Sequence, residues 1–139
     1  MASEFDLWAA LVAIAEADTG AGGLVTLCRK PNPLVVWGDS GMRKRPVITG
    51  LIVSAPRRSG TANGFRVRYQ FDAHVERTDL AEGLASRILD RLEERVTQAA
   101  LAAQGIDAAP TEKLRRDLPS LEEGGMRKAA EYEFLMTRS

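Results

Sequence analysis

Hydrophobic and polar residues alternate without a break from Phe65 to Val75. The apolar set is Phe65, Val67, Tyr69, Phe71, Ala73 and Val75, and the polar set is Arg66, Arg68, Gln70, Asp72 and His74. A period of two places the sets on opposite faces of a β-strand. At about 3.3 Å per residue the strand would be about 35 Å long. Its register is strongly fixed, because a slip of one residue would turn every apolar side chain to the wrong face.

A second alternating segment, Arg127 to Thr137, predicts another strand. One face would carry Ala130, Tyr132, Phe134 and Met136, and the other Ala129, Glu131, Glu133 and Leu135. If this strand pairs antiparallel with the first, Glu131 and Glu133 come close to Arg66 and Arg68. Each cross-strand ion pair would contribute only about 0.2–1 kcal/mol. Burial of the apolar face matters more, at about 1.5–3 kcal/mol per large side chain.

Two other segments have the periodicity of amphipathic helices. The first follows the N-cap residue Ser3 and should end near Asp18, with its apolar stripe formed by Trp8, Leu11, Val12 and Ala15. The second has apolar residues at steps of four from Leu80 to Val96 and an alanine-rich continuation to Gln104, with Gly105 as its end. Thr78 or Asp79 is expected to cap this second helix.

Shorter segments between glycines and prolines complete the expected fold. Leu34–Trp37 predicts a short strand, and Val47–Ala55, apolar on both faces, predicts a strand covered on both sides. Residues 56–64 predict a wide hairpin loop, and the glycines of residues 20–23 predict a flexible link. Residues 106–125, with two prolines and a Gly-Gly pair, predict a long connection with one helical turn around Lys113 to Arg116.

Together these elements predict a single α+β domain over residues 1–139. Its antiparallel or mixed sheet would have about four strands, with two main helices packed on one face, in the order α-β-β-β-α-β. The hydrophobic share of 45% and the charged share of 27% are ordinary for a globular domain. No apolar run approaches the roughly 20 residues that span a bilayer. The acidic start of the chain and its single cysteine, Cys28, predict a cytoplasmic product.

Few residues suggest catalysis or ligand binding. Gly38-Asp39-Ser40-Gly41 matches the nucleophile tetrapeptide of chymotrypsin-like serine proteases, but the only histidine, His74, follows the serine instead of preceding it. We interpret the tetrapeptide as a turn, His74 as a polar-face residue and Cys28 as a small hydrophobic residue. A zinc site needs three or four ligands, and residues 20–23 lack the Gly-Lys-Ser/Thr of a phosphate-binding loop. No catalytic residue, metal site or cofactor is predicted.

Basic residues form three local groups, although 19 cations balance 19 anions over the whole chain. Such groups can bind a phosphate backbone or form ion pairs within and between subunits. Because the net charge is zero, we favour ion pairs. The predicted subunit or partner interface therefore consists of Arg43, Lys44, Arg45, Arg57, Arg58, Arg66, Arg68, Glu131 and Glu133.

Several segments also follow one another in a recognisable order. They are the helix from Leu7 to Ala17, Arg45-Pro46-Val47-Ile48, the wide hairpin, Phe71-Asp72-Ala73-His74-Val75, Ala81-Glu82-Gly83-Leu84-Ala85 and the strand from Ala130 to Met136. In this order they resemble the tail terminator (head–tail joining, tail completion) proteins of long-tailed bacteriophages and phage-like particles.

This resemblance implies a structural virion protein at the head–tail junction, assembled in the host cytoplasm. Its subunits would close into a ring, commonly a hexamer, that caps the tail tube, ends tail polymerisation and joins the tail to the head connector. The implied partners are further copies, the tail tube protein and the head connector or stopper protein. DNA would pass through the channel without specific binding, and no membrane, cofactor or catalysis is implied.

Three other hypotheses remain open. The chain could be a different phage neck component, such as a stopper-type connector protein. It could be a small nucleic-acid-binding α+β module, which would bind in a salt-sensitive way through Arg66 and Arg68. The third hypothesis is an enzyme with Ser40 or His74 at its centre, although no acid–base pair can be assembled from the sequence.

Overall fold

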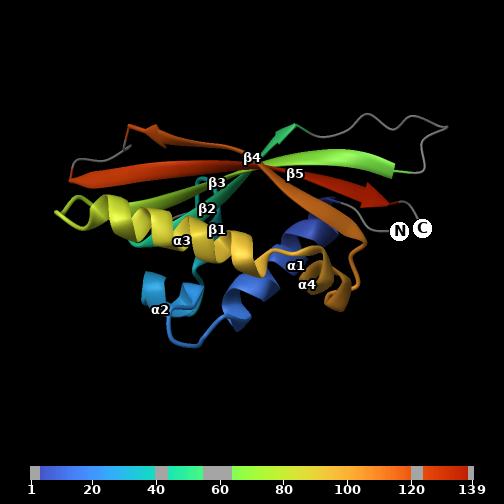
Figure 1. Ribbon diagram of the computed structural model, residues 1–139, viewed down its shortest axis with the longest axis horizontal. Coiled ribbons are helices and arrows are strands. Elements are labelled where there is room, and N and C mark those ends of the chain that lie inside the picture. Colours follow the sequence, from blue (N-terminus) through green and yellow to red (C-terminus); the bar gives the residue numbers. More distant parts are fainter. Residues whose placement is uncertain (1–3, 40–43, 55–63, 120–123, 138–139) are drawn as a thin grey trace.

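The computed structural model describes residues 4–39, 44–54, 64–119 and 124–137 and has two layers. Figure 1 shows a twisted sheet with all the labelled helices on one side of it. The elements are α1 (Glu4–Ala17), α2 (Leu24–Cys28), β1 (Leu34–Val36), β2 (Val47–Ser54), β3 (Gly64–Glu76), α3 (Ala81–Arg95), α4 (Gln98–Ala103), β4 (Ala108–Leu118) and β5 (Gly125–Thr137). The strand order is β1-β2-β3-β5-β4. The predicted α+β class with a mixed sheet is confirmed.

The two alternating segments form the centre of the sheet, as predicted. β3 and β5 pair antiparallel along their whole length, with Tyr69 opposite Tyr132. Their apolar faces are buried, and Tyr69, Phe71, Tyr132 and Phe134 form an aromatic cluster with centroid distances of 5.5–6.5 Å. Rings at these distances attract one another beyond the effect of burial alone. Period-two alternation was therefore sufficient to predict the two strands and their buried face.

The first helix is present, but its buried stripe is offset from the predicted one. Leu7 and Leu11 are fully buried, whereas Trp8 and Val12 are half-buried. The indole of Trp8 lies over Gly50 of β2 and stacks at 6.0 Å on Tyr69. Gly50 allows this close approach because it has no Cβ. The helix ends at Ala17, as expected.

The link between α1 and α2 is a hydrogen-bonded turn, which corrects the prediction of a flexible one. The Gly23 amide donates to the Gly20 carbonyl at 2.9 Å. Asp18, only 4% exposed, accepts from the Leu24 amide at 2.9 Å. Arg91 of α3 donates to both Asp18 carboxylate oxygens at 2.7 and 2.8 Å. The turn is therefore fixed to a helix 73 positions away in the sequence.

The second predicted helix is two helices. α3 ends at Arg95, and Thr97 begins α4 as an extended N-cap whose hydroxyl accepts from the Ala100 amide at 3.1 Å. This side-chain cap competes with continuation of α3. The predicted cap at Thr78 or Asp79 was also wrong, because the N-cap position is Leu80 and no side chain caps there. The predicted end at Gly105 is confirmed by its positive φ of 81°.

The largest error of the sequence-based prediction concerns residues 108–118. They were expected to be a connection with a helical turn, but they form the edge strand β4, antiparallel to β5. A register shift between Glu112 and Leu114 interrupts its alternation. The strand reads Ala-Ala-Pro-Thr-Glu before the bulge and Leu-Arg-Arg-Asp-Leu after it, so the segment lacks the period-two pattern of the central strands. The sheet therefore has five strands instead of about four.

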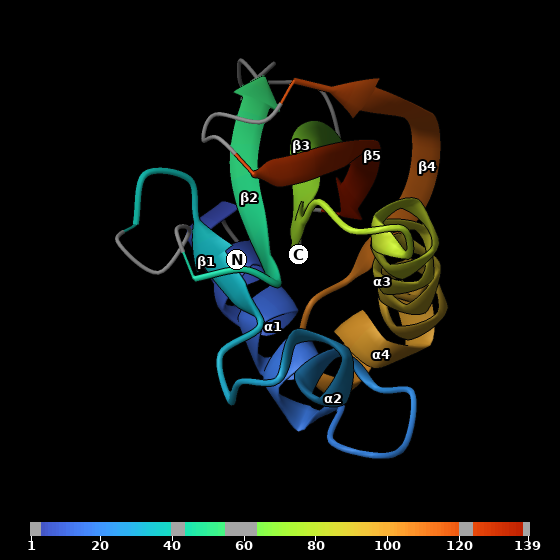
Figure 2. The same ribbon diagram turned by 90° about the vertical axis from the view of Figure 1, so that its left-hand side faces the viewer.

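The edge strand opposite β4 is β1. It pairs parallel with β2, and β2 pairs antiparallel with β3 (Figure 2). β2 is covered on both sides only in its first half: Val47–Gly50 are buried and Leu51–Ser54 are exposed. The hairpin loop predicted at residues 56–64 lies almost entirely outside the described residues. Within the described parts of the chain, no helix is long and apolar enough to cross a lipid bilayer.

Candidate functional site

None of the described helices lies on one side of the sheet, and most of the predicted interface residues that are described lie on that side. Opposite residues of an antiparallel pair share one face, so the register places Arg68 beside Glu133 and Gln70 beside Glu131. We call this side the open face. It contains Arg66, Arg68 and Gln70 of β3, Glu131, Glu133 and Leu135 of β5, Leu51 of β2, and Thr111, Lys113, Leu114 and Arg116 of β4.

The predicted ion pairs across β3 and β5 are present. Arg68 lies 3.4 Å from Glu133 and 3.8 Å from Glu131, and Arg66 lies 3.9 Å from Glu133. Lys113 of β4 adds a third cation at 3.9 Å from Glu133. The glutamates are 17–19% exposed, whereas Arg66 and Arg68 are 72% and 45% exposed. The carboxylates therefore lie low on the face and the cations extend outward.

Three leucines lie among these charges. Leu51, Leu114 and Leu135 are 42–49% exposed, and each comes from a different strand. Leu51 and Leu114 belong to the same cross-strand row, at its two ends, with Gln70 and Glu131 between them. Single exposed leucines are ordinary, but several on one helix-free face, together with outward cations, are typical of a surface that another protein covers.

The other predicted basic residues do not join this face. Arg43, Arg57 and Arg58 lie outside the described residues. Lys44 is exposed, and its carbonyl accepts a hydrogen bond from Lys30. Arg45 is only 14% exposed on its side chain and pairs with Glu76 at 3.2 Å. The basic residues of the predicted interface that are described are therefore divided between the open face and the start of β2.

The far end of the helix-free side is covered, and there the structure shows a cluster that the sequence did not indicate. His74 is only 5% exposed, and its Nε2 lies 2.8 Å from the Thr49 hydroxyl. Trp37 lies against His74, and the Arg127 guanidinium lies over the Trp37 ring at 5.4 Å. Burial, with the nearby charges of Arg127 and Arg45, lowers the pKa of His74 to about 4. His74 is on the predicted polar face but is neutral and buried at physiological pH.

Asp72 completes this cluster. It is 1% exposed and accepts from Arg127 at 3.1 Å and from Gln70 at 2.8 Å. Burial raises its pKa, and the hydrogen bonds and the charge of Arg127 only partly oppose this effect. Arg127 therefore connects Asp72 of β3 with the ring of Trp37.

Of the two residues considered for an enzyme, Ser40 lies outside the described residues and His74 is buried. The Thr49 hydroxyl beside His74 is also fully buried. Cys28 is also buried, and burial raises the pKa of its thiol to about 11. Among the described residues, no three His, Cys, Asp or Glu side chains are grouped so that they could hold a metal ion.

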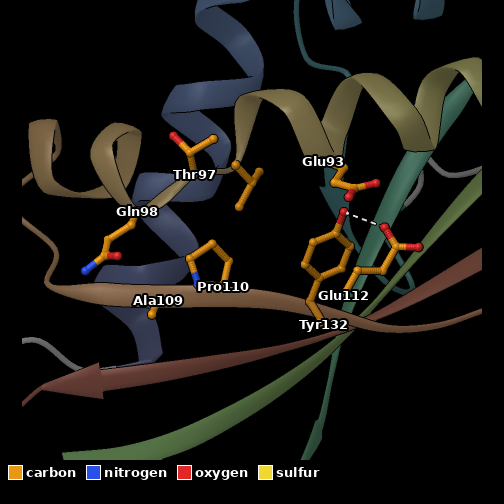
Figure 3. A pocket seen from close by; sticks show the side chains of 8 residues that line it. Glu93, Thr97, Gln98, Ala109, Pro110, Glu112 and Tyr132 are labelled. Carbon is orange, nitrogen blue, oxygen red and sulfur yellow. Dashed lines mark hydrogen bonds between the residues drawn. The ribbon is translucent and has the colours of Figure 1, made fainter.

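One pocket was not suggested by the sequence. It has a volume of about 330 Å³ and lies between the α3–α4 junction and β4, lined by Glu93, Thr97, Pro110, Glu112 and Tyr132 among others (Figure 3). The Tyr132 hydroxyl donates to Glu112 at 3.2 Å. A hydrogen bond with Glu112, together with burial, raises the pKa of Glu93.

Arg115 contacts the carboxylates of this pocket wall. Its guanidinium pairs with Glu93 at 3.0 Å and also with Asp90 and Glu112. These contacts connect β4 with α3, so the acidic groups already have a structural role in holding the edge strand against the helix layer. We therefore place the candidate site on the open face and not in the pocket.

Comparisons with known proteins add no family assignment. No protein-family model matches the chain, and no characterised protein is detectably similar to it. The functional argument therefore depends on the fold and on the open face.

Proposed function

We propose that this protein is a structural subunit of a ring at the end of a phage tail tube. The observation that carries the proposal is the one-sided covering of the sheet. Helices bury one face of the β3–β5 ribbon, whereas the other face presents exposed leucines and outward cations. A surface of this kind suits a subunit that is completed by neighbouring copies.

In this proposal the ring, a hexamer as the resemblance implies, stops tail polymerisation and presents a surface to the head connector. The partners are further copies, the tail tube protein and the connector. The subunit has no catalytic step and no cofactor, and DNA passes through the channel without sequence readout. The site of action is the head–tail junction of the virion.

The open face is less suited to a nucleic-acid-binding module. Arg66 and Arg68 are partly neutralised by Glu131 and Glu133. The exposed Leu51, Leu114 and Leu135 lie between these charges, and a phosphate backbone offers no apolar surface to cover them. This observation favours a protein partner over a phosphate backbone.

The test uses the full chain, alone and mixed with purified tail tubes. Light scattering and electron microscopy should show rings, either in solution or at tube ends, and tube ends with bound rings should no longer elongate. A monomer at high concentration that does not bind tubes would contradict the proposal. Binding to the head connector without binding to the tube would support the stopper-type alternative. Salt-sensitive DNA binding that is lost in Arg66→Ala/Arg68→Ala would support the nucleic-acid module.

A further inference from the structure

Leu80 occupies a position that the stability of the subunit does not explain. It is the N-cap residue of α3, where Ser, Thr, Asp or Asn would satisfy a free backbone amide and leucine cannot. Its side chain is 78% exposed, the largest value among the exposed large hydrophobic residues described. The Thr78 hydroxyl accepts from the Leu80 amide at 3.3 Å. A residue that neither caps the helix nor enters the core is available for contact with another molecule.

The surroundings of Leu80 are acidic. Residues 76–82 contain three carboxylates, those of Glu76, Asp79 and Glu82, and one cation, Arg77. Glu76 is paired with Arg45 at 3.2 Å. Asp79 and Glu82 are exposed; Lys128 lies 3.9 Å from Glu82, but the Glu82 side chain is still 72% exposed. We call Asp79, Leu80 and Glu82 the acidic knob. It lies where α3 begins, at one end of the molecule (left in Figure 1), on the helix side of the sheet.

The open face has the complementary character. Its described charges are four cations, Arg66, Arg68, Lys113 and Arg116, against two carboxylates that are less exposed than the cations with which they pair. Its leucines provide an apolar surface between these cations. The knob thus presents one leucine between carboxylates, and the open face presents leucines between cations.

From this complementarity we propose that the acidic knob of one copy docks on the open face of the next copy. The two surfaces lie on opposite sides of the sheet, so the contact is heterologous. A heterologous contact closes into a ring when the rotation between copies fits and otherwise continues as a filament. This inference depends on the ring function proposed above and names the surfaces that would form the ring contact.

The first test replaces Leu80 by serine. Leu80→Ser removes the exposed apolar group and introduces a residue that is favoured at an N-cap, so the melting temperature should stay equal or rise. The concentration needed for half-maximal ring formation, in solution or on tail tubes, should rise at least about tenfold, as for an interface residue of central importance. The matched control is Val36→Thr, which changes a 51% exposed residue outside both surfaces and should leave ring formation unchanged.

The second test reverses charges. Asp79→Lys/Glu82→Lys should weaken ring formation, and Lys113→Glu/Arg116→Glu should weaken it similarly. A chain with all four changes should recover much of the loss, because the attraction is restored with opposite sign. Asp107→Lys, an exposed change away from both surfaces, is the control. Wild-type ring formation should also weaken as salt is added.

The outcomes separate the two proposals. If the wild type forms rings and neither Leu80→Ser nor the charge reversals affect them, the docking contact is wrong and the ring function stands. If the wild type forms no ring in solution or on tubes, the ring function itself is wrong. If the variant with all four charge changes folds but assembles no better than either double variant, the pairing of these two surfaces is wrong.

Discussion

The two faces of the β3–β5 ribbon have the same backbone and the same register but opposite chemistry. On the helix side, Phe71 and Phe134 are fully buried in an aromatic cluster. On the open side, Arg68 and Glu133 form an ion pair in contact with water. Burial makes the first face the main source of stability, whereas solvent screening leaves the second with small energies. The second face is therefore free to serve recognition, and the following predictions test this division.

The largest effect is expected for a truncation in the helix-side cluster. Phe71→Ala removes a fully buried ring that contacts Tyr69, Tyr132 and Phe134, and should lower the free energy of unfolding by about 3–5 kcal/mol. The change Arg66→Ala, at a 72% exposed residue on the open face of the same strand, should lower it by less than about 0.5 kcal/mol. Urea unfolding of both variants measures the difference. Equal losses would mean that the two faces are not energetically distinct.

The next largest loss of stability is expected for the removal of a buried charge in the helix layer. Asp18→Asn removes the carboxylate that holds Arg91 and should cost about 1.5–3 kcal/mol at neutral pH. The hydrogen bond from Arg91 is the main cause that lowers the pKa of Asp18, so its stabilisation is present above the unfolded-state pKa and is lost as pH falls through the lower folded-state pKa. The gap between wild type and variant should therefore narrow in acid.

Asp72, on the helix-free side, provides the control because its pKa is raised by burial. Its contribution is present at low pH and is lost as pH rises through the folded-state pKa. Relative to Asp72→Asn, the wild type should gain stability on acidification. Relative to Asp18→Asn, it should lose stability. Unfolding curves at several pH values between about 3 and 7 would show the two signs. The same sign for both would contradict this account.

A substitution at the close contact between α1 and β2 should lower the stability by a similar or smaller amount. A Cβ at position 50 would lie 2.3 Å from Cζ3 of Trp8, so Gly50→Ala must displace the indole. Overpacking of this kind costs about 1–3 kcal/mol. Gly83→Ala is the matched control, since nothing lies within 4 Å of a Cβ there and alanine favours the helix by about 0.5–1 kcal/mol. Thermal unfolding should thus shift in opposite directions for the two variants.

The smallest effect is expected on the open face. A double-mutant cycle of Arg68→Ala and Glu133→Gln should give a coupling energy of about 0.2–1 kcal/mol. The coupling should decrease in high salt, because both side chains are reached by water. A coupling well above this range would mean that the ion pairs stabilise the fold and are not mainly a recognition surface.

The central ribbon could be predicted from the sequence because its information is local. Alternation over Phe65–Val75 and over the last strand fixes which residues share a face, and therefore predicted that Arg66 and Arg68 lie near Glu131 and Glu133. The end of the first helix and the stop at Gly105 were also predictable, because turn and cap preferences act within a few residues.

The remaining features depend on contacts between residues far apart in the chain, and only the tertiary structure decided them. The Asp18–Arg91 pair joins positions 73 residues apart, and β4 is a strand because β5 offers it a free edge, although its bulge and charges hide the alternation. His74 is packed against Trp37, which the turn after β1 brings over the sheet. The sequence alone determined which groups share each face of the ribbon. The fold decided which distant segments cover the apolar face and which part of the polar face Trp37 covers, because those contacts join residues far apart in the chain.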